Sequence, residues 1–430
     1  MLRHVPARRG RRRGPGRSKL ALFALLLLTL AGCGGQKSDS KNGEASTPGR
    51  SGKWKPARNP AAAKEDRAEV EALPYLRGYN APIDGRNGVV VYDRERAAPG
   101  LNLLASGHAA EAILLTMEGR ELRRWALPLA QAFPRLAQRP HAEKLDFWRR
   151  VRLLDDGSLL AIYEGLGVVK IDRASRLQWK RAGAFHHDLD VAPDGSIWLL
   201  DREGKVLPRI NPKEGVLEDF VTKLAPNGKV VDRISILRAF EESPFASYLD
   251  AMPHTGDILH TNTLELLDGS LADQIPAFKA GNLLVSVLQT STLAVIDPET
   301  GQVVWALRGK WRKQHQPTVL ANDHLLLFDN IGIDRDHSRA LEIDPRRGEI
   351  VWQYAGPPEA PLASRTLGSV QRLANGNTLI TEAERGRAVE VTPDNRIVWE
   401  YHSPFRTGEQ DALVAALLEV IRLDPATENH

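Results

Sequence analysis

A strand–turn–strand phrase recurs along most of this chain and constrains its fold more than any other feature. Each copy joins a short apolar run to a β-rich run through a polar turn, and most copies end in tryptophan. The copies begin at Leu114, Lys170, Lys223, Val295, Glu342 and Glu390. A second hairpin phrase alternates with the first, and Asp-Gly or Asn-Gly in most of its copies supplies the positive φ that a two-residue turn requires. Its turns lie at Asp155, Asp194, Asp268, Asn322 and Asn375.

The length of the repeat indicates the architecture. Two alternating hairpins give four strands per unit, and the last three tryptophans of the first phrase are 47 residues apart. Four-stranded units of roughly 40–50 residues are typical of β-propellers. The sequence therefore predicts an all-β fold, a six-bladed β-propeller of four-stranded blades over 84–425, followed by a short tail at 426–430. A β-sandwich and a β-solenoid are the competing folds, and 406–424 fits either a helix or the strand that closes the ring.

The first 33 residues have the pattern of an export signal. A basic leader with eight Lys and Arg residues and no acid precedes the apolar run 20–30, which is too short for a confident membrane span. The run ends in Leu-Ala-Gly-Cys33, which resembles the bacterial lipobox. We therefore expect a lipoprotein signal peptide at 1–32, a lipidated Cys33 and a flexible linker within 33–83. A plain anchor helix with a buried Cys33 is the alternative, and a twin-arginine signal fits the leader as well.

Charge and cysteine content narrow the classes of function. The net charge of +4 becomes −4 when 1–32 is removed, because that segment holds eight basic residues and no acid. The remainder therefore has no basic excess that would favour nucleic acid. A single cysteine excludes an internal disulfide, so the fold must be held by its own core. We expect an exported lipoprotein on the periplasmic face of a bacterial membrane or on the cell surface.

Three histidines share one position in the repeat. His187 and His315 lie seven residues before the turn of their units, and His260 lies eight before its own, within one bulge of the same place. The first strand of a propeller blade lies nearest the central channel, so these side chains should converge on one axial pocket. Converging histidines suit either metal binding or nucleophilic catalysis with anion stabilisation. Their neighbours supply amides more than carboxylates, which favours an anion, so we expect no metal and no cofactor.

Several phrases around these histidines resemble the bacterial arylsulfate sulfotransferases. They are Phe185-His-His-Asp188, Leu259-His-Thr-Asn-Thr263, Gln314-His315 with Leu327-Phe-Asp-Asn330, His337–Ile343 and Gly368–Ile380. The resemblance runs through roughly 150–405. It implies a six-bladed propeller that acts outside the cytoplasm and moves a sulfuryl group from a phenolic sulfate ester to another phenol. It also implies a sulfohistidine intermediate and no nucleotide donor.

The resemblance implies a role for each matching residue. His315 would be the nucleophile, His260 and Asn262 would bind the sulfuryl oxygens, and His187 or its neighbour His186 would act as acid or base. A close cluster of this kind titrates as a coupled set.

One departure from the family pattern concerns a cation. The family has an arginine in the strand after the second histidine motif, where this chain has Leu288. Arg149, which shares the axial register of the histidines, and Arg365, near the start of its strand, are the candidates to replace it.

Two other functions remain open on the sequence. The missing arginine favours a catalytically altered propeller that binds a ligand or a protein, and the histidines alone would also fit a metal enzyme. The sequence has no Gly-x-x-x-x-Gly-Lys loop and no Gly-x-Ser-x-Gly motif, which argues against a nucleotide enzyme and a serine hydrolase. The expected partners are a small-molecule aryl sulfate, a phenol and, through Cys33, a membrane.

Overall fold

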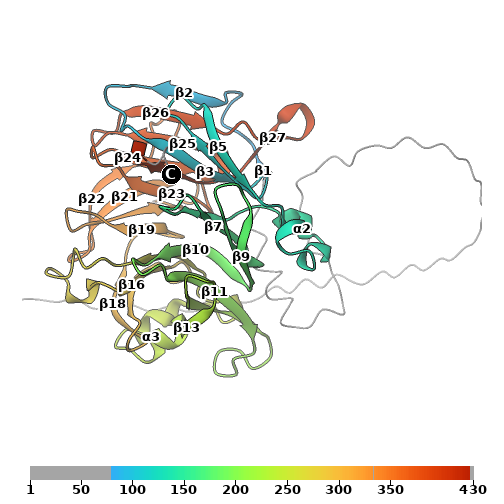
Figure 1. Cartoon of the computed structure of the whole chain (residues 1–430). Coiled ribbons are helices and arrows are strands. Elements are labelled where there is room, and N and C mark those ends of the chain that lie inside the picture. Colours follow the sequence, from blue (N-terminus) through green and yellow to red (C-terminus); the bar gives the residue numbers. More distant parts are fainter. Residues whose placement is uncertain (1–78, 333, 427–430) are drawn as a thin grey trace, which may run out of the picture. The chain divides into compact units, whose positions relative to one another are not determined.

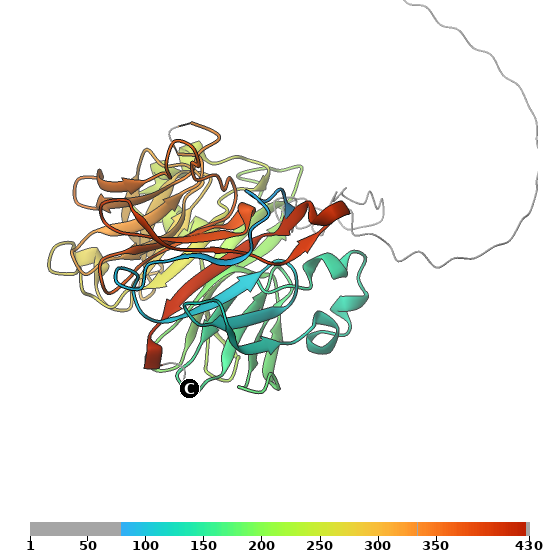
Figure 2. The ribbon, with the colours of Figure 1, turned by 90° about the horizontal axis from the view of Figure 1, so that it is seen from above.

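A computed structural model describes residues 79–332 and 334–426. In this part of the chain the sequence repeats form six mainly antiparallel sheets around a central axis, each with one end strand innermost (Figures 1 and 2). The predicted all-β, six-bladed propeller of four-stranded blades is therefore confirmed. The predicted signal peptide, the lipidated Cys33 and most of the predicted linker lie outside the described residues. Among the described residues, no helix is both long enough and apolar enough to cross a bilayer.

The blades follow the chain in order, each listed from the innermost strand outwards. Blade one comprises β29 (Leu417–Leu423), β3 (Leu101–Ser106), β4 (Glu111–Leu115) and β5 (Glu121–Ala126). Blade two comprises β6 (Arg150–Leu153), β7 (Leu159–Tyr163), β8 (Gly167–Ile171) and β9 (Leu177–Ala182). Blade three comprises β10 (Phe185–Val191), β11 (Ile197–Lys205), β12 (Val216–Leu224) and β13 (Val230–Ser235), and β14 (Gly256–Asp257) pairs with β12.

The second half of the ring repeats this arrangement. Blade four comprises β15 (Thr261–Leu266), β16 (Leu283–Val287), β17 (Thr292–Asp297) and β18 (Gln302–Arg308). Blade five comprises β19 (His315–Val319), β20 (Leu325–Asp329), β21 (Arg339–Asp344) and β22 (Glu349–Tyr354). Blade six comprises β23 (Ser369–Arg372), β24 (Thr378–Glu382), β25 (Arg387–Val391) and β26 (Ile397–His402), with β2 (Gly88–Tyr92) as a fifth, outer strand.

A few elements lie outside the blades. The short strands β1 (Tyr79–Asn80), β28 (Leu413–Ala415) and β27 (Arg406–Thr407) form a small separate sheet. Two short helices, α2 (Leu129–Ala132) and α3 (Ile236–Glu241), lie in the connections that follow blade one and blade three. Because β1 falls within the predicted linker 33–83, pairing with the rest of the fold begins before residue 84.

The last strand closes the ring. β29 pairs with β3, so the stretch 406–424 supplies the closing strand and not the alternative helix. Arg422 on β29 is buried and ties this strand to blade six, because its Nη1 lies 2.9 Å from Glu390 Oε2. Its Nε also donates to Asn102 Oδ1 at 2.8 Å. The charge of Arg422 is therefore compensated inside the closure, which is the condition under which a buried cation is tolerated.

Side chains of one blade also bind the exposed edge of the next. The innermost strands leave backbone N–H groups without a strand partner, and such groups are costly when they are buried. Asp188 and Asp190 of β10 accept the N–H groups of Leu264 and Leu266 at 3.0 and 2.9 Å. Glu265 of β15 accepts the N–H of Val319 at 3.1 Å. Acidic residues around the channel are therefore partly structural.

Candidate active site

Bulges in three neighbouring innermost strands bring the histidines together. The register shifts by two residues directly after His186 in β10. It shifts by one residue directly after Thr261 in β15 and His315 in β19. His187 lies within the bulge of β10 with a φ of 54°, and His260, directly before β15, has a φ of 51°. A positive φ is uncommon for residues other than glycine and is concentrated at functional sites. The bulge inferred for His260 alone is thus part of a pattern shared by three blades.

The predicted convergence of the histidines is present in the structure. The ring centroid of His187 lies 5.1 Å from that of His260, 6.5 Å from that of His315 and 5.1 Å from that of His186. His186, His187 and His315 are buried, whereas the His260 side chain keeps 13% of its surface exposed. His260 is therefore the most exposed of the four histidines.

The hydrogen bonds around His315 determine which ring nitrogen carries the proton. Nδ1 lies 2.7 Å from Asn330 Oδ1 and 2.9 Å from the Lys313 carbonyl oxygen. The Asn330 amide cannot be reversed, because its Nδ2 already donates to the carbonyl oxygens of Ser364 and Leu367 at 2.7 Å each. Since both groups facing Nδ1 only accept, Nδ1 carries the hydrogen and the lone pair is on Nε2.

Nε2 of His315 is buried and has no hydrogen-bond partner. Burial, followed by the charge of Arg149, lowers the pKa of His315 to about 3. The imidazole is therefore neutral throughout the physiological range. A neutral imidazole with an unpartnered lone pair has the protonation state that a nucleophile requires.

His260 has the opposite electrostatic setting. Its Nδ1 lies 2.6 Å from Asp257 Oδ2. Burial alone would lower the pKa of His260, but the negative charges of Asp257 and then Asp219 outweigh it and raise the pKa above its usual value. The cluster therefore combines a neutral His315 with a His260 that holds a positive charge more readily than usual.

His186 and His187 form a second pair. Their Nδ1 atoms are 2.8 Å apart, so one of them donates a hydrogen to the other. Burial lowers the pKa of both rings well below the usual value. The pair is therefore neutral and shares one hydrogen between the two Nδ1 atoms.

Two arginines lie close to the histidines. Arg149 is 3% exposed, its Nε has no hydrogen-bond partner, and its charge lowers the pKa of both His187 and His315. Arg202 on β11 pairs with Glu164 at 3.4 Å, and its charge acts on His186 and on His187. Arg149, directly before β6, and Arg202 are thus two cations whose charges act on the histidines, and a role of Arg149 in sulfate binding stays a prediction.

The remaining predicted residues lie elsewhere. Asn262 is fully buried, and its Nδ2 donates to the Gln314 carbonyl oxygen at 2.8 Å, so it supports the segment that leads into His315. Contact of Asn262 with a sulfuryl oxygen stays a prediction. Arg365 is exposed in the loop between β22 and β23, and the structure places it in no contact with the histidines. Leu288 lies beside His260, because its N–H donates to the His260 carbonyl oxygen at 3.3 Å.

One group in the described part of the chain has ligand atoms close enough together for a metal ion. Its members are Glu164, His186 and His187, whose ligand atoms lie within 4.8 Å of one another. The 2.8 Å contact between the two Nδ1 atoms is a hydrogen-bond distance, and Arg202 already pairs with Glu164. The contacts of this group therefore suit a shared proton and an ion pair better than a metal ion.

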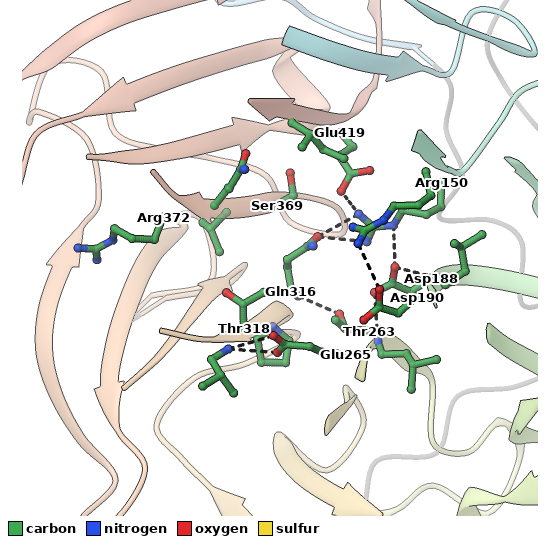
Figure 3. Close-up of a pocket in the computed structure, with 18 of the residues that line it drawn as sticks. Arg150, Asp188, Asp190, Thr263, Glu265, Gln316, Thr318, Ser369, Arg372 and Glu419 are labelled. Atoms are coloured by element: carbon green, nitrogen blue, oxygen red, sulfur yellow. Dashed lines mark hydrogen bonds and ion pairs between the residues drawn. The ribbon is translucent and has the colours of Figure 1, made fainter. Parts of the chain in front are cut away.

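A cavity of about 340 Å³ lies along the axis beside the cluster and is lined by the innermost strands of all six blades (Figure 3). Arg150 connects the cavity with the histidine cluster. Its side chain lines the cavity, and its Nε donates to the His187 carbonyl oxygen at 3.3 Å. The guanidinium pairs with Asp188 at 2.9 Å and with Glu419, and it donates to Gln316 Oε1 at 3.1 Å (Figure 3). Arg150 is thus held by its neighbours, in contrast to Arg149.

Fold and cluster together define a six-bladed β-propeller with a buried axial site of histidines and arginines. The family model described as Arylsulfotransferase (ASST) matches residues 150–404, which is more than half of the chain. The chain belongs to this family. Its function is accordingly that of an aryl sulfotransferase-like enzyme, and the family implies small-molecule aryl sulfates and phenols as substrates.

Several solved structures are similar to this chain at low identity. A protein of unknown function from Bacteroides caccae has 14% identity and a TM-score of 0.46, over 71% of this chain and 94% of that one. Virginiamycin B lyase from Staphylococcus aureus, catalytically inactive and with quinupristin, has 14% identity and a TM-score of 0.42, over 77% and 89%. The β-propeller domain of Cps50 (Swd1) from Myceliophteria thermophila has 11% identity and a TM-score of 0.43, over 76% and 90%. No curated protein matches this chain.

Sequence reasoning missed several residues of this site. Glu164 and Asn330 lie just beyond the ends of the second strands β7 and β20, and Arg202 lies inside the longer second strand β11. Each lies five positions after the first residue of its strand, so an equal register along the second strands is the signal that marks them. Asp257 lies three residues before His260, and a carboxylate at that spacing was a usable signal. Asp219 lies inside β12, and nothing in the sequence marks it.

Proposed function

We propose that this chain is an arylsulfate sulfotransferase that moves a sulfuryl group from a phenolic sulfate ester to a phenolic acceptor through a sulfohistidine on His315. The observation that carries the proposal is the unpartnered Nε2 lone pair of His315, which Asn330 and the Lys313 carbonyl oxygen orient by accepting the hydrogen of Nδ1. A buried neutral imidazole can attack sulfur without first losing a proton. The reaction needs no nucleotide donor and no metal.

The first half-reaction sulfurylates the enzyme. His315 Nε2 attacks the sulfur, the N–S bond forms, and the bond from sulfur to the aryl oxygen breaks with its electron pair going to the phenolate. Charge on the three outer sulfuryl oxygens is balanced by the Arg149 guanidinium and the His260 imidazolium. Cations already in place in a water-poor site stabilise developing charge without reorganisation. His187, with its partner His186, gives a proton to the leaving oxygen.

The second half-reaction reverses these steps with another phenol. The acceptor oxygen attacks the sulfur of the sulfohistidine, the N–S bond breaks, and its electron pair returns to His315 Nε2. The acceptor proton passes to the His187–His186 pair. Leu288, which stands where the family has an arginine, contributes no charge. Arg149 therefore supplies the electrostatic stabilisation that the family residue would supply, and Arg202 adds a second positive charge near the histidines.

The test of this proposal uses the purified full chain, 4-nitrophenyl sulfate as donor and phenol as acceptor, with nitrophenolate release followed by absorbance. Release that depends on phenol supports sulfuryl transfer. Release that is independent of phenol indicates hydrolysis of the ester. No release from a folded protein favours a catalytically altered binding propeller, with Leu288 as the reason.

Inorganic sulfate should bind this site more weakly as the pH rises through the raised pKa of His260, because the imidazolium then loses its charge. Asp257→Asn removes the carboxylate that contributes most to that raised pKa, so the pKa of His260 falls and the loss of binding moves to lower pH. Calorimetric titration of sulfate over a pH series, with the His260 pKa followed by NMR, measures both effects. Binding that does not change with pH would contradict the role of His260.

We further propose that the protein is exported and anchored to a bacterial membrane through a lipid on Cys33, on the periplasmic face or the cell surface. The support is the basic leader, the apolar run and the lipobox-like residues before Cys33. Metabolic labelling with a radioactive fatty acid should mark the wild-type protein and not Cys33→Ser. Equal labelling of both proteins would exclude Cys33 as the attachment site.

A further inference from the structure

Two buried polar atoms beside the histidine pair face each other without a hydrogen-bond partner. They are His186 Nε2 and Asp219 Oδ1, which lie 3.7 Å apart on side chains that are 2% and 1% exposed. Buried polar atoms without a partner are rare in folded proteins and costly. Their separation exceeds hydrogen-bond range by only a few tenths of an ångström. A small rotation of either side chain brings them into contact.

These atoms continue a line that begins at His187. The Nδ1 atoms of His187 and His186 share a hydrogen at 2.8 Å, and His186 then presents its Nε2 to Asp219. The other oxygen of Asp219, Oδ2, accepts the N–H of Thr261 at 2.6 Å and so fixes the carboxyl group against blade four. Imidazole and carboxyl groups alternate as donors and acceptors along this line, which is the arrangement that conducts a proton.

The proposed reaction requires a proton to leave the protein and to return. The leaving phenolate gains a proton in the first half-reaction, and the acceptor phenol loses one in the second. His186, His187 and Asp219 are almost fully buried, so exchange of their protons with bulk water is restricted. The proton therefore needs a buried position that is occupied in the resting enzyme and empty in the sulfurylated enzyme.

We propose that His187, His186 and Asp219 form a proton relay in which Asp219 stores the catalytic proton between the two half-reactions. This inference rests on the proposed sulfotransferase function and extends it. Asp219 is the end of the relay, and His186 carries the proton between Asp219 and His187. His187 is the member that meets the substrate oxygen.

Each transfer balances. In the resting enzyme, hydrogens are on Asp219 Oδ1, His186 Nδ1 and His187 Nε2. As the donor ester breaks, the His187 Nε2 hydrogen passes to the phenolate oxygen, the His186 Nδ1 hydrogen to His187 Nδ1, and the Asp219 hydrogen to His186 Nε2. Both imidazoles stay neutral and Asp219 becomes a carboxylate. The acceptor phenol then drives the same transfers in reverse and restores the resting state.

The groups that face Asp219 suit a carboxyl that gains and loses a proton. His186 comes from β10, and Arg202 is its cross-strand neighbour on β11. Asp257 and His260 approach from the segment that leads into β15. Burial, followed by the charge of Asp257, raises the pKa of Asp219 to about 7. For Asp257 itself, the pairing with His260 outweighs the effect of burial and lowers the pKa to about 2. Of these two acids, Asp219 is the one that can hold a proton near neutral pH.

The test compares donors whose leaving groups differ in their need for a proton. Phenolate is a poor leaving group and needs one, whereas 4-nitrophenolate leaves readily without one. In single-turnover reactions of Asp219→Asn, the rate of sulfurylation by phenyl sulfate should fall by about 10²–10⁴-fold, which is the usual contribution of general acid catalysis. The loss of rate with 4-nitrophenyl sulfate should be smaller than this by a factor of at least about ten. Asp257→Asn, which acts through His260, should slow both donors by similar factors. Equal losses with the two donors in Asp219→Asn, or no loss, would overturn the relay.

A second measurement needs no variant. A relay moves several protons in one step, so the wild-type rate with phenyl sulfate should depend on the deuterium fraction of the solvent in a curved manner. The rate with 4-nitrophenyl sulfate should show a smaller isotope effect. A linear dependence with phenyl sulfate would overturn the relay while leaving the sulfotransferase function intact. If the wild-type protein released neither phenol from phenyl sulfate nor 4-nitrophenol from 4-nitrophenyl sulfate, the proposed sulfotransferase function would itself be overturned.

Discussion

Replacing His315 with alanine should reduce turnover of 4-nitrophenyl sulfate by about 10⁴-fold or more, since loss of a covalent nucleophile removes the whole two-step route. The structure gives the reason, because His315 is the histidine whose Nε2 lone pair is left exposed to the cluster by a fixed Nδ1–H. The measurement is nitrophenolate release with and without phenol.

His254→Ala is the matched control for that substitution. His254 is exposed in the segment before β14 and shares no register with the cluster, so its replacement should change turnover by less than about twofold, as is usual for surface positions. Phenol-dependent release that persists in His315→Ala would show that another group is the nucleophile. His187 would then be the next residue to replace.

Replacing Arg149 with alanine should lower kcat/KM for 4-nitrophenyl sulfate by about 10²–10³-fold, the usual effect of losing one donor that stabilises developing negative charge. Arg149 is buried and its Nε has no partner, so its charge is available to the sulfuryl oxygens. Arg149→Lys should recover part of the rate, because it restores the charge but not the planar fork of donors.

A parallel measurement on Arg365→Ala decides between the two arginines that the sequence suggested. Arg365 is exposed in its loop, so a larger loss in Arg149→Ala than in Arg365→Ala is the expected order. The reverse order would contradict the assignment and would mean that the loop between β22 and β23 closes over the substrate.

The propeller could be predicted because short local sequence signals mark each strand–turn–strand unit. A two-residue turn needs positive φ, so Asp-Gly and Asn-Gly mark hairpins wherever they occur, and the tryptophans fix their spacing. The segment 406–424 was ambiguous for a physical reason. Its alanines and leucines suit a helix as well as a buried strand, and only pairing of β29 with β3, more than 300 residues earlier in the chain, selects the strand.

The convergence of His187, His260 and His315 could also be predicted. Because the blades are arranged around one axis, residues at equivalent positions of the innermost strands lie near the same point of the central channel. The different protonation states of these histidines could not be predicted. Burial opposes the charge on His260, and its pKa is raised by Asp257 and then by Asp219, which lies inside a strand of another blade. The lowered pKa of His315 depends mainly on burial. The tautomer of His315 depends on Asn330, whose own orientation is set by two backbone carbonyl groups far along the chain. Contacts of this kind arise from tertiary structure and leave no local pattern.

The most direct test of the account is to trap the sulfurylated enzyme. The purified full chain is mixed with 4-nitrophenyl sulfate without acceptor, quenched in alkali, and digested for peptide mass spectrometry. The account predicts one added SO₃ group, located on the imidazole of His315, that disappears when phenol is added before the quench. An adduct on another residue, or phenol-dependent turnover with no trapped adduct at all, would contradict it.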